Sequence, residues 1–253
     1  MPQLSLNGRL FDVDLIAFDK DGTLIDFHHL WGRKTQLWVE WLQQRVHGPA
    51  SLGQALYRNL GYDPESGRVV NDGPLAVASM AKLYTIAAAV LYQHGISWHD
   101  AEQIVAESVA ASVGALPAPD LIRPIGDVAG TIERLAVAGV HLAVITSDNR
   151  VATQATLVTL GIAGKIDILV CGDDPIANKP APDALWHIGR LLNVAPARMM
   201  MVGDTAGDML CGSNSGVGCR LGILGGAGDE ATLTACADVT LTSIDEIHLA
   251  ESA

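Results

Sequence analysis

The sequence predicts an α/β fold, a parallel sheet with helices between its strands, and an all-helical segment inserted near its start. Short apolar runs alternate with helical segments from residue 118 onward. Such alternation favours parallel strands, because each helix carries the chain back to the start of the next strand. One further apolar run, 13–18, stands before the insertion, and between Asp26 and Pro117 helical periodicity replaces the strand signal.

The spacing of apolar residues and the positions of glycines predict the individual strands and helices. Short apolar runs predict strands at 13–18, 141–146, 166–171, 199–202 and 219–223. Amphipathic segments predict helices that include 127–138, 149–160, 182–192 and 228–236. Gly139 and Gly161 stand where two helices should stop. The result is a Rossmann-like parallel sheet, whose ligands are expected at the carboxyl ends of the strands.

The insertion predicts a separate α-helical domain at 27–117, which leaves 1–26 and 118–253 for the α/β core. Large apolar side chains fall on one broad face of its first helix: Leu30, Trp31, Leu37, Trp38, Trp41 and Leu42. We interpret this stripe as domain core and not as a substrate-stacking surface. Ser97 to Asp100 predicts a capping box for a helix that runs to about Ser112. Pro117-Ala118-Pro119 predicts a hinge linker.

Composition limits the class of protein. The chain has 253 residues, of which 49% are hydrophobic, enough for a large buried core. The stretch from Met1 to Phe11 has no secretory pattern, and the longest apolar stretch, near Ile86–Tyr92, is too short for a bilayer. A soluble, cytoplasmic protein without a membrane partner is expected. The net charge of −12 argues against nucleic acid as a partner. The sequence does not decide between a monomer and a homodimer.

The cysteines show no close pairing motif: Cys171, Cys211, Cys219 and Cys236. Their spacing favours buried free thiols over disulfides or a zinc site. Free thiols suit a reducing cytoplasm.

Two carboxylates, Asp19 and Asp21, follow the first apolar run and flank Lys20. In a strand the side chains i and i+2 leave the same face, so both are expected to lean toward one reacting group. Lys20 should then point to the opposite face, toward a neighbouring loop or solvent, with little effect on chemistry. Asp and Gly are also ordinary turn residues. This segment alone therefore favours chemistry and a simple turn about equally.

Polar residues after the later apolar runs favour chemistry. Thr146 and Ser147 follow the second predicted strand, Lys179 precedes a predicted helix, and Asp204 and Asp208 follow the run of methionines at 199–201. Parallel strands bring their carboxyl ends to one edge of the sheet. The set of carboxylates, hydroxyl and lysine is the set that phosphoryl transfer requires.

Each of these residues has a predicted role. Asp19 would attack phosphorus and form an aspartyl-phosphate, which divides one difficult displacement into two easier ones. Asp21 would protonate the leaving oxygen and then take a proton from the hydrolytic water. Thr146, the Ser147 amide and Lys179 would bind the phosphoryl oxygens.

A hard divalent cation is predicted beside the nucleophile. Its expected ligands are the Asp19 and Asp204 carboxylates and the main-chain carbonyl of Asp21, with Asp208 as a further ligand or a neighbour of one. Oxygen ligands of this kind suit Mg²⁺. The cation would hold Asp19 ionised and offset its repulsion of the phosphate.

Together these motifs resemble those of haloacid dehalogenase (HAD) superfamily phosphatases: Asp19-Lys20-Asp21-Gly22-Thr23, Thr146, Lys179 in Lys-Pro-Ala-Pro-Asp, and Gly203-Asp204 with Asp208. The Lys-Pro-Ala-Pro-Asp and Gly-Asp-Thr segments are similar to the phosphoglycolate phosphatase-like subgroup. The resemblance covers nearly all of the chain outside about 27–117. It implies the HAD fold, with the insertion as an α-helical cap domain that closes over the site. Members that cleave carbon–halogen bonds lack the second aspartate, so Asp21 favours phosphate esters.

The sequence therefore predicts a Mg²⁺-dependent phosphomonoester hydrolase for a small phosphorylated metabolite. A phosphomutase, which returns the phosphoryl group to its substrate, uses the same motifs and stays an alternative. A non-catalytic binding protein on this fold is a third reading, but no nucleophile or metal ligand is missing here.

Substrate contacts are harder to predict. His28, His29 and Arg33 lie at the start of the cap and are candidates for substrate contact by position. The glycine-rich run Gly222–Gly228 invites a dinucleotide interpretation, but its spacing does not fit Gly-x-Gly-x-x-Gly. We expect it to be a loop beside the site.

Overall fold

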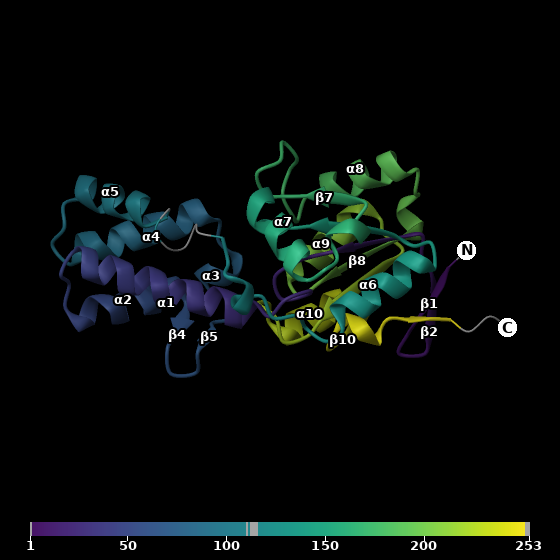
Figure 1. Cartoon of the computed structure of the whole chain (residues 1–253), viewed down its shortest axis with the longest axis horizontal. Coiled ribbons are helices and arrows are strands. Elements are labelled where there is room, and N and C mark those ends of the chain that lie inside the picture. Colours follow the sequence, from purple (N-terminus) through teal and green to yellow (C-terminus); the bar gives the residue numbers. More distant parts are fainter. Residues whose placement is uncertain (1, 110, 112–115, 251–253) are drawn as a thin grey trace. The chain divides into compact units, whose positions relative to one another are not determined.

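The computed structural model describes residues 2–109, 111 and 116–250. The chain divides into two compact units (Figure 1). The core unit comprises Met1–Asp26 and Ala118–Ala253, and the cap unit comprises Phe27–Pro117. The division falls where the strand pattern of the sequence gives way to helices.

A six-stranded parallel sheet forms the centre of the core unit, in the order β10-β9-β8-β3-β6-β7. Its strands are β3 (Leu15–Phe18), β6 (His141–Ile145), β7 (Ile168–Val170), β8 (Met199–Gly203), β9 (Cys219–Ile223) and β10 (Val239–Leu241). All five predicted strands are present, so the predicted parallel sheet is confirmed. The short edge strand β10 was not predicted.

Helices connect these strands, as the α/β prediction requires (Figure 1). They are α6 (Val128–Val137), α7 (Arg150–Thr159), α8 (Asp183–Leu192), α9 (Ala206–Ser215) and α10 (Glu230–Cys236). Single 3₁₀ turns stand at Pro119–Leu121, Ala163–Lys165, Pro196–Arg198 and Ile244–Glu246. Gly139 and Gly161 take φ values of +81° and +72° just past α6 and α7, which confirms them as helix stops.

The sheet is anchored by alternate residues of its central strands. On one face Leu15 and Ala17 of β3 pack with residues of β6 and β8 against Leu185 and Ile188 of α8. The strands β3 and β8 are buried along their whole length. A sheet held rigidly in this way can position polar groups at its strand ends within the tolerance that catalysis needs.

A small antiparallel sheet joins the two ends of the chain (Figure 1). It consists of β1 (Gln3–Leu6), β2 (Arg9–Asp12) and β11 (His248–Leu249), with Ser5 opposite His248. No local sequence pattern predicts this sheet, because its pairing joins segments from opposite ends of the chain.

The cap unit is mainly helical: α1 (Phe27–Arg45), α2 (Ala50–Leu60), α3 (Pro74–Val77), α4 (Met80–Gln93) and α5 (Trp98–Ser108). The expectation of helices alone was wrong in one respect, since β4 (Tyr62–Asp63) and β5 (Arg68–Val69) form a short hairpin. Two-residue strands are too short to leave an alternating pattern. The Ser97 hydroxyl accepts from the Asp100 amide and caps α5, whereas the predicted helix end at Ser112 lies outside the described residues.

The residues of the tryptophan stripe of α1 differ in how deeply they are buried. Trp38 is fully buried, packs edge-to-face on Tyr84, and donates its indole N–H to the Ser108 hydroxyl at 2.6 Å. Leu30 and Leu42 are also buried. Other members of the stripe are only partly buried, or exposed in the case of Leu37. The interpretation as core therefore holds for the centre of the stripe and not for all of it.

Truncating Trp38 should destabilise the cap. A Trp38→Ala change removes a fully buried ring, and we expect a loss of about 3–5 kcal/mol in the free energy of unfolding. Urea unfolding followed by far-ultraviolet circular dichroism measures it. Leu37→Ala, on the exposed side of the same helix, should cost about 1 kcal/mol or less. Equal losses in the two variants would contradict this view of the cap core.

The described residues contain neither a helix that could span a membrane nor a disulfide. No helix there is both long and apolar enough to cross a bilayer. All four cysteines lie in the described ranges and are free: Cys171, Cys211 and Cys219 are buried, and Cys236 is partly buried. The prediction of free thiols is confirmed, although Cys236 is not fully buried.

Candidate active site

The polar motifs converge at the carboxyl edge of the central sheet. Phe18 of β3 lies opposite Val144 of β6 and Val202 of β8, so the residues that follow these strands emerge together. The amide of Asp19 donates to the Val202 carbonyl at 2.8 Å, which extends the ladder by one residue. The sheet register thus places Asp19 beside the loops that begin at Thr146 and Asp204.

Lys179 joins two of the predicted acidic residues. Its ammonium forms ion pairs with Asp19 and with Asp208, the latter at 2.6 Å. The side chains of all three are largely buried. Burial alone would lower the pKa of Lys179, but the two carboxylates outweigh it and raise that pKa above its ordinary value. Lys179 therefore stays charged beside the predicted nucleophile.

Asp208 is fixed by the first turn of α9. Its carboxylate accepts from the Thr205 amide at 3.0 Å and from the Thr205 hydroxyl at 2.6 Å, which completes a capping box. Its other oxygen receives Lys179. Because both oxygens are engaged by protein groups, Asp208 is placed to orient Lys179.

Asp204 lies in a tight cradle. Its carboxylate accepts from the Ala227 amide at 2.7 Å and from the Thr23 hydroxyl at 3.3 Å. A Cβ atom added to Gly22 or Gly226 would come within 3.0 Å of this carboxylate, closer than real Cβ atoms come. Gly22 also has φ +94°. These two positions therefore need glycine.

Sequence reasoning missed the contribution of Gly226 and Ala227. The glycine-rich run was noticed and expected to lie beside the site, but without a role. The structure gives it one, because the loop between β9 and α10 supplies an amide to Asp204. Glycines after a strand in a parallel sheet were the available signal.

Burial and mutual repulsion raise the pKa values of two of the carboxyl groups in the site. Burial raises the pKa of Asp19 to about 7, with the nearby Asp208 and Asp21 adding to the rise and Lys179 opposing it. Burial, followed by repulsion from Asp19 and Asp208, raises the pKa of Asp204 well above its ordinary value. One lysine therefore does not offset all the negative charge gathered here.

This donor set fits a hard divalent cation. Among residues 2–109, 111 and 116–250, no group of three His, Cys, Asp or Glu side chains is arranged to hold a metal ion. The predicted site needs only two carboxylates, Asp19 and Asp204, with a main-chain carbonyl as third ligand. Oxygen donors with excess negative charge are the environment that Mg²⁺ prefers.

Thr146 and Ser147 open the loop after β6. Thr146 is buried, and its hydroxyl accepts from the Asp148 amide at 3.1 Å. Ser147 is exposed. Gly172 packs against the Ser147 main chain so closely that a Cβ there would collide with the Ser147 carbonyl. The loop is thus held rigidly at the edge where Asp19 emerges.

The expectation that Lys20 points away from Asp21 was wrong, whereas the expected contact with a neighbouring loop is present. Lys20 is almost fully buried, and its ammonium lies 2.8 Å from the carboxylate of Asp21 and 3.0 Å from that of Asp148. The strand β3 ends at Phe18, and residues 21–25 form a turn in which the Gly22 amide donates to the Ile25 carbonyl. Alternation between sheet faces applies only within a strand, so it does not set the direction of Lys20.

A comparison with family models decides the class of protein. The model described as haloacid dehalogenase-like hydrolase matches residues 13–216, which include Asp19, Asp21, Thr146, Lys179, Asp204 and Asp208. The chain is a haloacid dehalogenase-like hydrolase. The resemblance predicted from the sequence is confirmed.

Two curated relatives of this hydrolase are phosphatases. Phosphoglycolate phosphatase of Neisseria meningitidis serogroup A is 25% identical over 237 residues, covering 90% of this chain and 88% of the relative. Validoxylamine A 7'-phosphate phosphatase of Streptomyces hygroscopicus subsp. limoneus is 26% identical over 231 residues, covering 91% and 94%. With the family match, they indicate that this hydrolase is an enzyme of the phosphatase type, as predicted.

A solved structure shows the same fold. A predicted phosphoglycolate phosphatase from Haemophilus somnus superposes with a TM-score of 0.66 at 17% identity, covering 92% of this chain and 95% of that one. At this identity the likeness concerns the fold alone. The predicted HAD fold is therefore confirmed.

The cap residues proposed for substrate contact are placed within the cap unit. In this hydrolase His28 is buried, accepts from the Val69 amide at 3.2 Å, and lies 2.9 Å from an Arg68 nitrogen. Arg33 is exposed and donates to Gln36, and His29 is partly buried. His28 has a structural role in the cap, and substrate contact by the three residues stays a prediction.

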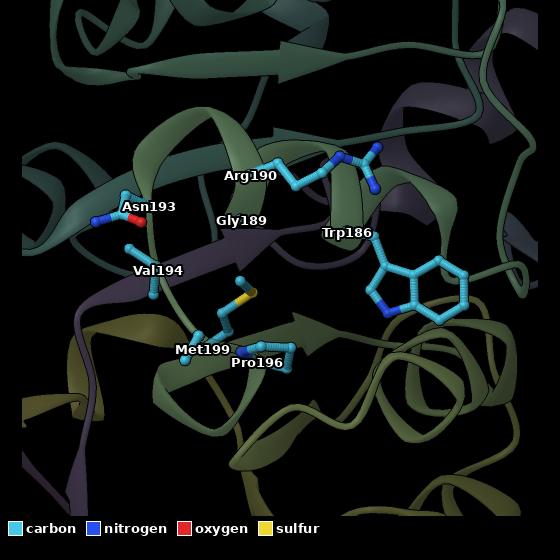
Figure 2. A pocket seen from close by; sticks show the side chains of 8 residues that line it. Trp186, Gly189, Arg190, Asn193, Val194, Pro196 and Met199 are labelled. Carbon is cyan, nitrogen blue, oxygen red and sulfur yellow. The ribbon is translucent and has the colours of Figure 1, made fainter.

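A surface pocket of the hydrolase lies away from the motifs. Figure 2 shows it between α8 and the start of β8, with Trp186, Arg190 and Met199 around it. Met199 is the first residue of β8, whereas Asp204 follows the last. The pocket is therefore at the amino end of that strand, opposite the edge where the catalytic motifs converge.

Proposed function

We propose that this hydrolase is a Mg²⁺-dependent phosphomonoesterase that acts on a small phosphorylated metabolite through an aspartyl-phosphate on Asp19. The observation that carries the proposal is the ion pair between Asp19 and Lys179 at the carboxyl edge of the sheet. Lys179 also forms an ion pair with Asp208. An isolated buried carboxylate would be poorly placed to meet a phosphate dianion. Lys179 supplies the positive charge that lets the two approach.

In the first step an Asp19 carboxylate oxygen forms a bond to phosphorus as the bond from phosphorus to the ester oxygen breaks. Asp21 gives its proton to that oxygen, and the alcohol leaves. In the second step water attacks the phosphorus of the aspartyl-phosphate, and Asp21 takes a proton from the water. Inorganic phosphate is released and both carboxyl groups return to their starting state.

The remaining residues hold the transferred group. Lys179, the Thr146 hydroxyl and the Ser147 amide would bind the phosphoryl oxygens as charge shifts during transfer. Asp208 would keep Lys179 in place through its 2.6 Å ion pair. Each acts by position, which is the main source of catalysis in phosphoryl transfer.

A Mg²⁺ ion would be held by the carboxylates of Asp19 and Asp204 and by the main-chain carbonyl of Asp21, with Asp208 close by. When bound, the ion offsets the negative charge of the phosphate and of the carboxylates. The cradle formed by Gly22, Gly226 and the Ala227 amide would keep Asp204 oriented for this role.

The substrate is proposed only as a class. Two relatives of nearly equal identity, 25% and 26%, are named for phosphoglycolate and for validoxylamine A 7'-phosphate. Identity at this level therefore does not select a substrate. We propose that the cap selects it, with His28, His29 and Arg33 as the first positions to test. All four cysteines are free, which supports the expected cytoplasmic location.

Phosphate release by the purified protein tests the proposal. A panel of small phosphate esters is assayed with Mg²⁺, with chelator, and with the Asp19→Asn variant. We expect release that requires the metal and is lost in the variant. Release from no ester would contradict a hydrolase. Transfer of the phosphoryl group to a second position on a sugar phosphate, without release, would identify a mutase instead.

The glycine cradle gives a sharper test. In Gly226→Ala the new methyl group would push the Asp204 carboxylate aside, and we expect phosphate release to fall about 10²-fold. The apparent affinity for Mg²⁺, measured by titrating metal in the same assay, should fall as well.

Gly164→Ala is the matched control, since a Cβ there meets nothing within 4 Å. It should leave both phosphate release and metal affinity unchanged. Full activity in Gly226→Ala would argue against Asp204 as a metal ligand.

A further inference from the structure

Lys20 makes two contacts that the proposed mechanism does not use. Both oxygens of the Asp21 carboxylate lie 2.8 Å from its ammonium nitrogen, so the ammonium bridges them. The same nitrogen donates to Asp148 at 3.0 Å. Only about 1% of the Lys20 side chain is exposed, whereas 14% of Asp21 is. A buried ammonium thus contacts both oxygens of a carboxylate that is itself partly exposed.

The second partner ties this contact to the phosphate-binding loop. Asp148 lies one residue beyond Ser147, and its amide donates to the Thr146 hydroxyl at 3.1 Å. Its carboxylate also accepts from the Asn149 amide at 2.8 Å, at the start of α7. The chain from Asp21 through Lys20 to Asp148 therefore connects the turn after β3 with the loop after β6.

Two ion pairs hold the buried Lys20 ammonium between Asp21 and Asp148. A buried lysine that lost one partner would leave an uncompensated charge, which is strongly unfavourable. The side chain is therefore fixed in one place.

We propose that Lys20 is a positioning residue that orients the Asp21 carboxyl group toward the leaving oxygen and keeps it in register with the Thr146–Ser147 loop. The inference rests on the proposed function of Asp21 as proton donor and acceptor. Each carboxylate oxygen has two lone pairs, so contact with the ammonium leaves room on either for the proton that is transferred. A displacement of about 1 Å in such a group can cost on the order of 10²-fold in rate.

Leaving-group dependence separates positioning from a merely structural role. An alkyl phosphate needs its leaving oxygen protonated, whereas p-nitrophenyl phosphate releases a stable phenolate with little help from an acid. In Lys20→Met we expect kcat/KM for an alkyl ester, which reports formation of the aspartyl-phosphate and not its hydrolysis, to fall about 10²-fold. The loss of kcat/KM for p-nitrophenyl phosphate should be smaller by at least about tenfold.

Three further variants complete the test. Asp148→Asn removes the negative charge of the second partner. The alkyl ester should again lose more activity than p-nitrophenyl phosphate, with a smaller difference between the two. Lys20→Gln keeps a hydrogen-bond donor and decides the matter if Lys20→Met shows no cooperative unfolding transition. Lys165→Met, which removes an exposed pair with Glu133, should leave both activities unchanged.

The outcomes are distinct. Equal losses of kcat/KM on both esters in Lys20→Met and in Asp148→Asn would overturn the positioning role and assign these residues to folding alone. Unchanged activity on both esters would overturn it as well. Failure of the wild-type protein to release phosphate from either ester would instead contradict the proposed function.

Discussion

Replacing Asp19 by asparagine is expected to abolish phosphate release while the fold is retained. The amide is nearly isosteric and its oxygen can still accept from Lys179, but it cannot attack phosphorus as a carboxylate does. We expect kcat to fall by at least about 10⁴-fold, the scale seen when a catalytic nucleophile is removed. Phosphate release with saturating Mg²⁺ measures the effect, and circular dichroism checks the fold.

Asp14 provides the matched control for Asp19. It lies just before the opposite end of β3 and pairs with Arg198 at 2.7 Å. Asp14→Asn should leave kcat unchanged, because this carboxylate is at the wrong edge of the sheet for catalysis. Metal-dependent phosphate release that survives in Asp19→Asn would exclude Asp19 as the nucleophile. It would indicate that water attacks the phosphorus of the ester directly.

Removing the Lys179 ammonium should affect both catalysis and stability. In Lys179→Met the phosphoryl oxygens lose a fixed positive charge, and we expect kcat to fall about 10²- to 10³-fold. Asp19 and Asp208 also lose their shared partner within a buried site. Breaking such a buried pair should lower the free energy of unfolding by about 3–5 kcal/mol. Urea unfolding measures this loss of stability. A chelator is present so that no bound metal ion offsets the charges of Asp19 and Asp208.

Two comparisons test this interpretation of Lys179. Adding Asp208→Asn to Lys179→Met should recover part of the lost stability, because one of the two stranded charges is then gone. Lys165→Met breaks an exposed pair with Glu133 and should cost about 1 kcal/mol or less. A stability loss in Lys179→Met no larger than that in Lys165→Met would show that the buried ion pairs contribute little.

The sequence by itself determined five of the six strands of the central sheet and four of the five helices between them. Each of these elements has a local pattern of apolar residues long enough to read, and helix stops such as Gly139 are local as well. The edge strand β10 and the cap hairpin were missed because their strands of three and two residues do not stand within a longer apolar run. The three-residue β7 was predicted because it lies in such a run, 166–171. The small sheet of β1, β2 and β11 was missed because its pairing joins the two ends of the chain.

For the site, the sequence supplied the residue types and the rule that parallel strands collect their carboxyl ends at one edge. That rule brought Asp19, Lys179 and Asp208 together in prediction, and the structure shows them in contact. Only the tertiary structure decided which partners surround them. Lys20 turns toward Asp21 because β3 has already ended, and Ala227 reaches Asp204 through a loop 23 residues further along the chain. Periodicity describes a side chain only while its strand lasts, and beyond that point packing sets its direction.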